Sequence, residues 1–444
     1  MKQTSVEDPD ELCVEFASAG WGFVDIEAGL GNPLPHQRGL NRIHAGYQSG
    51  EDMKRTRDER SGLSAFKGLR VVELGSWVTA AAASALLADL GAEVIKVEPP
   101  AGDPSRQGFA AMGASTKQVP TFRLDNRGKR STVIDLGGDD GCRQMIELIA
   151  SADVFITNVR VGTLERLGLN PEPILSGCPR LIYALVTGYG RRGPDRNRAS
   201  YDIGAFWARS GLSHQLTPPG SAPLNMLGAL GDHVTSLSVV AAILAALCER
   251  SVTGQGGLVE TSLLQTGAWT LGWDLAMQAS FGRVNPAANR ADSLSPLMNP
   301  YRTADDRWLF LMGLDIKRHF GALCDALDQP GLLEDPRFSD PRSVRKNSKA
   351  LITILDAAFQ RRTLAEWAER LDAASMWWSP CSTPAEVLGD FQLSENGVLA
   401  EAGDPDEPLT LVPSPYTVFG HCPNIEPPPA LGEYHATARQ GGDD

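Results

Sequence analysis

The sequence lacks a surplus of basic charge and long apolar runs, and each absence argues against a class of protein. Its 444 residues carry 41 Lys and Arg against 54 Asp and Glu, which gives a net charge of -13. Nucleic-acid binders neutralise phosphates with a basic face, so we expect no nucleic-acid partner. We find no apolar run near the ~18–20 residues of a membrane span. The acidic N-terminus MKQTSVEDPDELCVEF also lacks the apolar core of a secretory signal. We therefore expect no membrane partner.

The sequence also lacks the cysteine, histidine and serine patterns of several enzyme classes. Its seven cysteines are scattered and form no C-x-x-C pair, which argues against a disulfide framework or a zinc site. Its seven histidines include no H-E-x-x-H, so we expect no catalytic metal. No G-x-S-x-G is present, which argues against a serine hydrolase. Unpaired thiols of this kind indicate a cytoplasmic protein.

What the sequence does contain is a regular alternation of strands and helices from Phe66 onward. LRVVELG (69–75) predicts a buried strand, TAAAASALLADLG (79–91) a helix, and AEVIKVE (92–98) a second strand. Strand, helix and strand within ~30 residues form a βαβ unit, which requires parallel strands. We therefore predict an α/β fold with a Rossmann-like, doubly wound parallel sheet. Further strands are expected at 131–136, 153–158 and 181–186, and a further helix at 139–152.

The two ends and the second half of the chain do not continue this alternation of strands and helices. Residues 1–62 are rich in charge and glycine, and we expect an N-terminal extension that is partly disordered. A long apolar helix is predicted after Gly231, and residues 258–280 are expected to begin as a strand and continue as helix. The last predicted elements are a hairpin at 301–313 and helical stretches at 315–328 and 346–374, followed by a Pro-rich, irregular tail.

A glycine turn follows the predicted strand at 181–186. Gly188, Gly190 and Gly193 satisfy the G-x-G-x-x-G spacing of a dinucleotide-binding turn. Such a turn opens a helix, whereas here Pro194-Asp-Arg-Asn-Arg follows and no helix is predicted to begin. We therefore expect no NAD or FAD, and interpret the motif as a tight turn beyond a strand end.

Asp232 directly precedes the long apolar helix, and its position allows two interpretations. Asp is among the best helix N-caps, so a structural cap explains the pattern. A reactive carboxylate is the alternative, since flanking glycines would let a substrate approach closely. Sequence neighbours on a helix point about 100° apart, so we expect His233 to face away from Asp232.

Four basic residues lie near predicted strand ends, where ligands bind in open α/β sheets. Each of them is open to two interpretations: a solvated surface charge, or part of a group that holds a phosphorylated cofactor. They are Lys129, Arg130, Arg160 and Arg166.

Beyond these patterns, the chain resembles the class III CoA-transferases over about residues 64–438. That family includes formyl-CoA:oxalate and carnitine CoA-transferases, and α-methylacyl-CoA racemase is its sister branch. The resemblance is carried by an ordered series of motifs: FKGLRVVELGSWVTAAAASALLADLGAEVIKVEPPAGDPSR, LDNRGKRSTVIDL, ADVFITNVRVGTLERLGL, PRLIYALVTGYGRRGP, LGALGDHVTSLSVVAAILAAL, TGQGGLVETSLL and YRTADDRW.

The resemblance implies an architecture and a reaction. It implies a large Rossmann-like CoA-binding domain over residues 63–280, a smaller α+β domain with linker helices over 281–375, and a segment 376–444 that returns to the large domain. It also implies an interlocked homodimer. The expected activity is transfer of CoA from an acyl-CoA to a carboxylic acid, and the family's nucleophilic aspartate matches Asp232.

The resemblance also implies a set of contacts to coenzyme A. The matching positions lie at the first predicted strand-to-helix turn, in the predicted strand at 131–136, in the Asn-Val-Arg of 158–160, at the Arg of ERLGL and in the Tyr-Asp that follows the glycine turn. They are Val78, Thr79, Ile134, Asp135, Leu136, Asn158, Val159, Arg160, Arg166, Tyr201 and Asp202.

Departures from the family pattern bear on the substrate. The racemase branch has His where Tyr201 stands, and a racemase needs two proton-transfer groups about the α-carbon, so Tyr201 favours transfer. The glycine-rich loop of the oxalate enzymes is absent from 282–300, which argues against oxalate as acceptor. Two alternatives stay open: an acyl-CoA racemase or isomerase, and a catalytically silent acyl-CoA-binding homologue.

Overall fold

The computed structural model describes residues 66–107, 119–226, 228–284, 289–402, 409–418 and 425–435. The predicted extension over residues 1–62 lies outside the described residues. All of the described residues belong to one compact unit, Gly62–Asp444.

A six-stranded parallel sheet organises the first half of the described chain. Its strand order is β3-β2-β1-β4-β5-β6, and every neighbouring pair is parallel. This is the order of a doubly wound Rossmann sheet, with the reversal of strand order between β1 and β4. The strands are β1 Arg70–Leu74, β2 Glu93–Glu98, β3 Lys129–Val133, β4 Val154–Thr157, β5 Ile182–Thr187 and β6 Gly257–Ser262.

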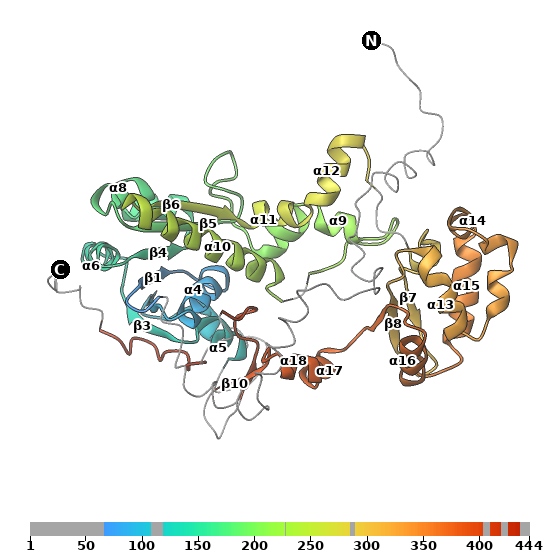
Figure 1. Cartoon of the computed structure of the whole chain (residues 1–444). Coiled ribbons are helices and arrows are strands. Elements are labelled where there is room, and N and C mark those ends of the chain that lie inside the picture. The colour runs from blue at the N-terminus through green and yellow to red at the C-terminus, as the bar shows by residue number, and fades with distance from the viewer. Residues whose placement is uncertain are drawn as a thin grey trace, which may run out of the picture. The chain divides into compact units, whose positions relative to one another are not determined.

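Alternate residues of each strand point to opposite faces of the sheet, and each face has its own hydrophobic core. On one face, Val71 of β1 and Ile156 of β4 pack with α4 Thr79–Asp89 and α10 Leu230–Thr253. On the other face, Val72 and Phe155 pack with α6 Asp139–Ala150, α7 Val161–Leu167 and α8 Pro171–Gly177. Helices therefore cover both sides of the sheet (Figure 1), as predicted for a doubly wound fold.

Shorter helices connect these elements. They are η1 Pro104–Gln107, α5 Pro120–Asn126, the π-helix η3 Ile203–Ala208, α9 Leu212–Leu216, α11 Leu263–Thr270, α12 Gly272–Phe281 and η4 Arg290–Asp292.

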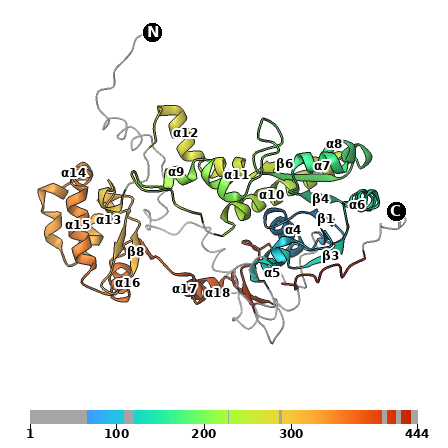
Figure 2. The same cartoon turned by 180° about the vertical axis from the view of Figure 1, so that it is seen from behind.

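A second sheet, β7-β8-β9, is antiparallel and has a core of its own. Tyr301 and Leu309 from the sheet pack with Phe359 and Trp367 from the neighbouring helices, and all four side chains are buried. Figure 2 shows this helical group from behind. The elements are β7 Pro300–Arg302, β8 Trp308–Leu311, α13 Ile316–Ala326, η5 Pro330–Leu333, η6 Pro336–Phe338, α14 Pro341–Lys346, α15 Ser348–Phe359, α16 Leu364–Ala373 and β9 Trp378–Pro380.

The described C-terminal residues contact the first sheet again. The Tyr434 amide donates to the Ser131 carbonyl at 2.9 Å, and the Ser414 hydroxyl donates to Asp89 at 2.6 Å. Before these contacts come α17 Pro384–Leu388, α18 Phe391–Glu395, β10 Ala400–Ala402 and β11 Leu409–Leu411.

The sequence predicted most elements of the first sheet, with two corrections. The strand expected at 131–136 is β3 Lys129–Val133, because the strand begins at a lysine that is buried rather than solvated. The long apolar helix predicted after Gly231 is α10, and the expectation that no apolar stretch is long enough for a membrane span was wrong, because the length and composition of α10 would allow it to cross one. Core helices pass the same test, and α10 buries one face against the sheet.

Candidate active site

A cavity of about 600 Å³ opens where the strand order reverses. Its walls come from the residues after β1 (76–79), the residues after β4 (158–161) and the carboxyl end of β5 (186–188). Ligands of open α/β sheets bind outside the carboxyl ends of the strands at this reversal. The fold thus places the cavity where a substrate crevice is expected.

Asp232 lies in this cavity, in the first turn of α10. The N-cap of α10 is Ala229, in a left-handed conformation with a φ of 35°, so the N-cap interpretation of Asp232 is wrong. Asp232 instead accepts a hydrogen bond on Oδ1 from the Thr79 hydroxyl. The preceding Gly231 is needed for packing, because a Cβ there would lie 2.6 Å from Phe206.

The surroundings of Asp232 disfavour its charged form. Burial is the main cause, and the nearby carboxylates of Asp202 and Asp125 act in the same direction. The Thr79 hydrogen bond and the charge of His233 oppose them. The net effect raises the pKa of Asp232 to about 6. Asp232 is therefore more basic than an ordinary carboxylate and is still mostly ionised at neutral pH.

The turn that carries Thr79 is fixed to the neighbouring strand by Asn158. The Ser76 amide donates to Asn158 Oδ1 at 3.0 Å, and Asn158 Nδ2 donates to the Ser76 carbonyl at 2.8 Å. The two hydrogen bonds join the residues after β1 to those after β4. Asn158 was predicted as a CoA contact, and within this chain it fixes the shape of the cavity wall.

Two aromatic side chains line the same cavity. Trp77 and Tyr201 meet edge to face, with ring centroids 6.3 Å apart and an interplanar angle of 89°. Trp77 has a φ of 66°, which is strained for a residue other than glycine and is typical of functional sites. Their exposed fractions, 42% for Trp77 and 65% for Tyr201, leave apolar surface open to a ligand.

Arginines supply positive charge along the cavity. Among the described residues, Arg160 has no ion-pair partner, and the one hydrogen bond of the Arg166 side chain goes to the Thr163 hydroxyl of its own helix, at 3.1 Å. Arg196 and Arg198 also line the cavity and pair with Glu165 and Asp195. Guanidinium groups bind phosphates well, so this cavity suits a phosphorylated ligand.

The other two basic candidates, Lys129 and Arg130, do not lie with these arginines at the cavity. Lys129 is buried and binds Glu73 at 2.8 Å. Arg130 pairs with Glu93 and stacks over the Tyr434 ring. Both lie at the amino end of β3, whereas the cavity is at the carboxyl ends of the strands, so the four residues form no common phosphate site.

The structure brings eight of the twelve predicted site residues to the cavity and leaves four outside its lining. Ile134, Asp135 and Leu136 follow the edge strand β3, and Ile134 is buried in the core. Asp202 caps η3, accepting from the Ile203 amide at 2.8 Å, and its Oδ2 is buried with no partner among the described atoms. The eight are Val78, Thr79, Asn158, Val159, Arg160, Arg166, Tyr201 and Asp232.

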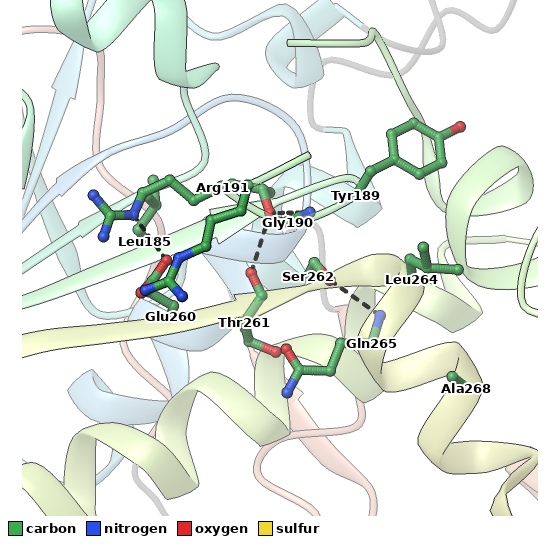
Figure 3. Close-up of a pocket in the computed structure, with 12 residues that line it drawn as sticks. Leu185, Tyr189, Gly190, Arg191, Glu260, Thr261, Ser262, Leu264, Gln265 and Ala268 are labelled. Atoms are coloured by element: carbon green, nitrogen blue, oxygen red, sulfur yellow. Dashed lines mark hydrogen bonds and ion pairs between the residues drawn. The ribbon is translucent and has the colours of Figure 1, made fainter. Parts of the chain in front are cut away.

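The glycine turn borders a second cavity, also of about 600 Å³ (Figure 3). Arg191 reaches from the turn to Glu260 of β6 at 2.9 Å and also pairs with Glu172 of α8. Residues 188–201 contain no helix, which confirms that the motif is not the start of a dinucleotide-binding helix. The arginine pairs anchor the turn to the sheet instead.

His233 faces away from the nucleophile candidate, as predicted. Its Nε2 lies 3.0 Å from Asp125 Oδ1. The Asp125 hydrogen bond raises the pKa of His233. His233 lines a separate apolar cavity of about 240 Å³ between α4 and α10.

Sequence reasoning missed several residues of the cavity wall. The strained backbone of Trp77 had no signal in the sequence, and the ion pairs of Arg196 and Arg198 depend on contacts that only the fold creates. The missed residues include Ser76, Trp77, Arg196, Arg198, Ser200 and Leu263. The described residues contain no group of three or more His, Cys, Asp or Glu that could hold a metal ion.

Comparisons with known proteins agree with this geometry. A model of CoA-transferase family III matches residues 66–435. The chain is 33% identical to (R)-2-hydroxy-4-methylpentanoate CoA-transferase of Clostridioides difficile, over 75% of this chain and 84% of that protein. It is 30% identical to succinyl-CoA:glutarate CoA-transferase of Mus musculus, over 86% of this chain and 87% of that protein.

The fold matches solved structures of the same group. A crystal structure of Rv3272 from M. tuberculosis superimposes with a TM-score of 0.73 at 30% identity, covering 84% of this chain and 98% of that one. A CAIB/BAIF family protein from Brucella suis gives a TM-score of 0.73 at 27% identity, covering 84% and 97%.

Proposed function

Because the chain belongs to CoA-transferase family III and is a CoA-transferase, we propose that Asp232 is its covalent nucleophile. The observation that carries this proposal is one carboxylate at the strand-order reversal, partly buried, with a pKa of about 6. A carboxylate of raised pKa is more nucleophilic than an ordinary one, yet it is mostly ionised at pH 7. Both properties suit attack on a thioester.

The proposed reaction moves CoA in four balanced steps. Asp232 attacks the acyl-CoA carbonyl, a C–O bond forms, and the C–S bond breaks to release CoA thiolate and leave a mixed anhydride. The thiolate attacks Cγ of Asp232 and displaces the first acid as carboxylate, which leaves an aspartyl-CoA thioester. The acceptor carboxylate then displaces thiolate to give a second anhydride. Thiolate attacks the acceptor carbonyl and frees Asp232. No step consumes ATP, since each intermediate keeps an activated acyl bond.

The cavity offers binding groups for both ends of an acyl-CoA. Arg160 and Arg166 would hold phosphates, and Trp77 and Tyr201 offer apolar surface near Asp232. Relatives transfer CoA to or from a hydroxy acid or a dicarboxylic acid. We propose a carboxylic acid acceptor for this chain, without committing to one acid.

We further propose that a second copy of the chain covers an apolar surface on α11 and α12. Trp269 of α11 and Trp273 of α12 are 80% and 84% exposed. No residue of α12, all of which the structure describes, is buried. Aromatic groups of this size are enriched in protein interfaces, which supports the homodimer that the family resemblance implies. Residues 281–375 as a smaller domain and the cytoplasm as location stay predictions.

The test of the mechanism is chemical trapping. The protein is incubated with acyl-CoA donors and hydroxylamine, and its peptides are analysed by mass spectrometry. We expect a hydroxamate on Asp232, and we expect Asp232→Ala to abolish CoA transfer while the protein stays folded. Full transfer by Asp232→Ala would reject the assignment.

The two alternatives predict different results. A racemase or isomerase would exchange the α-hydrogen of its acyl-CoA for deuterium without an acceptor acid. A silent homologue would bind CoA but catalyse neither reaction. Neither alternative predicts a hydroxamate on Asp232.

A further inference from the structure

Thr79 was predicted as a contact to CoA, but the structure directs its hydroxyl elsewhere. Thr79 is only 4% exposed, and its Oγ1 donates to Oδ1 of Asp232. Oδ2 of Asp232 has no donor among the residues that the structure describes. The two carboxylate oxygens are therefore distinct: one is held, and the other is free to attack.

This arrangement is held in place by the packing of α4 against α10. Ser236, one turn after Asp232, has its hydroxyl 2.7 Å from the Thr79 carbonyl and 2.8 Å from the Asp232 carbonyl. Ser236 is 1% exposed. Lys129 donates to the Ala81 carbonyl at 2.8 Å and so fixes the same turn of α4. The Thr79 hydroxyl has little freedom to turn away from Asp232.

We propose that Thr79 is a catalytic residue that holds Oδ1 of Asp232 and stabilises the negative charge that develops on this oxygen. The proposal rests on the proposed function, because it requires that Asp232 become acylated. It assigns Thr79 to the nucleophile and not to CoA.

The chemistry of the second and third steps calls for such a donor. When CoA thiolate attacks Cγ of the aspartyl anhydride, the C–S bond forms and the carbonyl electrons move onto the oxygen that is not part of the anhydride bridge. Oδ2 forms the bridge, so this oxygen is Oδ1.

The Thr79 hydroxyl donates to Oδ1 and keeps its own proton. When the intermediate collapses, the bridging C–O bond breaks and the carbonyl re-forms. Attack by the acceptor carboxylate on the thioester places charge on the same oxygen. A donor fixed in advance at such an oxygen is the arrangement of an oxyanion hole.

The same hydrogen bond orients the first step. An unheld carboxylate rotates about its Cβ–Cγ bond and presents either oxygen. Thr79 fixes the carboxylate plane and leaves Oδ2 facing the thioester. Thr79 also opposes the effect of burial on the pKa of Asp232. Removal of the hydroxyl therefore has a signature in the pH profile that loss of a CoA contact would not have.

The experiment compares Thr79→Val, which keeps the shape and loses the hydroxyl, with Thr79→Ser, which keeps the hydroxyl. Thr270→Val is the matched control, because the Thr270 hydroxyl donates to the Thr266 carbonyl of its own helix and Thr270 does not line the cavity. Each variant is assayed with the donor and acceptor pair that the wild type turns over fastest in a panel. Wild type and Asp232→Ala are run beside them, and thermal unfolding checks the fold.

We expect Thr79→Val to lose about 100- to 1,000-fold in kcat, as for removal of one oxyanion donor. In the Thr79→Val enzyme, the acid limb of the pH profile should move to higher pH, because the hydrogen bond that is lost lowers the pKa of Asp232 in the wild type. Its KM for acyl-CoA should be unchanged. Thr79→Ser and Thr270→Val should have near wild-type activity. A Thr79→Val enzyme with kcat within about threefold of wild type, while Asp232→Ala is inactive, would overturn the role of Thr79 and leave the proposed function intact. A wild type without transfer, or an active Asp232→Ala, would overturn the proposed function itself.

Discussion

Glu73 and Asp232 both accept a hydrogen bond from a hydroxyl of α4, and the rest of their surroundings differ. Glu73 accepts from Ser84, and two buried lysines bind its carboxylate, Lys96 at 2.7 Å and Lys129 at 2.8 Å. Among the described residues, Thr79 is the only side chain that donates a hydrogen bond to the Asp232 carboxylate. Burial alone would raise the pKa of Glu73, but the lysines outweigh it and lower the pKa to about 2, whereas the pKa of Asp232 is raised to about 6. The two lysines keep the Glu73 carboxylate charged and give it a structural role. Asp232 lacks such cationic partners, so its carboxylate remains available to react.

The buried cluster around Glu73 also ties the sheet together. Lys96 of β2 bridges Glu73 of β1 and Asp103, 2.9 Å away, and these attractions outweigh burial and raise the pKa of Lys96. Lys129 of β3 has the same Glu73, but burial and repulsion from Lys96 lower its pKa to about 8. The cluster joins three adjacent strands, so its loss should affect stability more than activity.

The largest effect on stability is expected from Lys96→Met. This change leaves the carboxylate of Asp103, whose side chain is 1% exposed, without its cationic partner. Breaking a buried pair on one side costs about 3–5 kcal/mol of unfolding free energy. Urea denaturation measures the loss. Lys349→Met is the control, since the Lys349–Asp292 pair is exposed and should contribute almost nothing. Equal stability of the two variants would mean that the cluster has no structural role.

Asp232→Asn should have the opposite effect and stabilise the fold at pH 7.5. The folded pKa of about 6 lies above the ordinary value of 3.8, so the folded state binds the proton more tightly than the unfolded state. The free energy of unfolding of the wild type therefore falls as the pH rises from about 4 to 6. Asn at position 232 does not titrate, so the variant does not lose this free energy. We expect a gain of about 1–3 kcal/mol at pH 7.5 that disappears near pH 4. A gain of equal size at both pH values would have another cause.

The pH dependence of activity should report the ionisation of Asp232. The reactive form of Asp232 is ionised, so kcat/KM should be level above about pH 7 and fall tenfold per pH unit below pH 6. Initial rates measured in overlapping buffers, with fluorescence as a check on folding, define the profile. A level profile down to pH 4.5 would contradict a raised pKa at the nucleophile.

The smallest effect is expected from Arg160→Ala. Arg160 lines the cavity without an ion-pair partner among the described residues, so it is free to bind phosphate. Loss of one exposed phosphate contact, about 1 kcal/mol, should raise the KM for acyl-CoA about fivefold and leave kcat nearly unchanged. Arg143→Ala, which removes an exposed pair with Asp140 on α6, should change neither constant.

The sequence could predict what depends on local patterns. Buried apolar runs identified β1 and β2, and a glycine identified the end of α4, because these signals lie within a few residues of the element. The strand β3 was misplaced since its first residue, Lys129, is a lysine whose partner Glu73 lies 56 residues away. From the local sequence pattern alone, such a lysine is taken to be exposed to solvent and therefore to lie outside a buried strand.

The same limit applies to the site. The resemblance to the family selected Asp232, but the residues alone favoured a helix cap. The contact that decides its environment comes from Thr79, 153 residues away, and it exists only after α4 packs on α10. The strained backbone of Trp77 likewise follows from the turn between β1 and α4, and no residue type announces it.

The comparison between Glu73 and Asp232 has one direct test. The protein is incubated with an acyl-CoA and hydroxylamine, digested, and the peptides that contain each carboxylate are analysed by mass spectrometry. We predict hydroxamate on Asp232 alone, with Glu73 unmodified. An unmodified Asp232 in an enzyme that transfers CoA at its full rate would contradict the central claim.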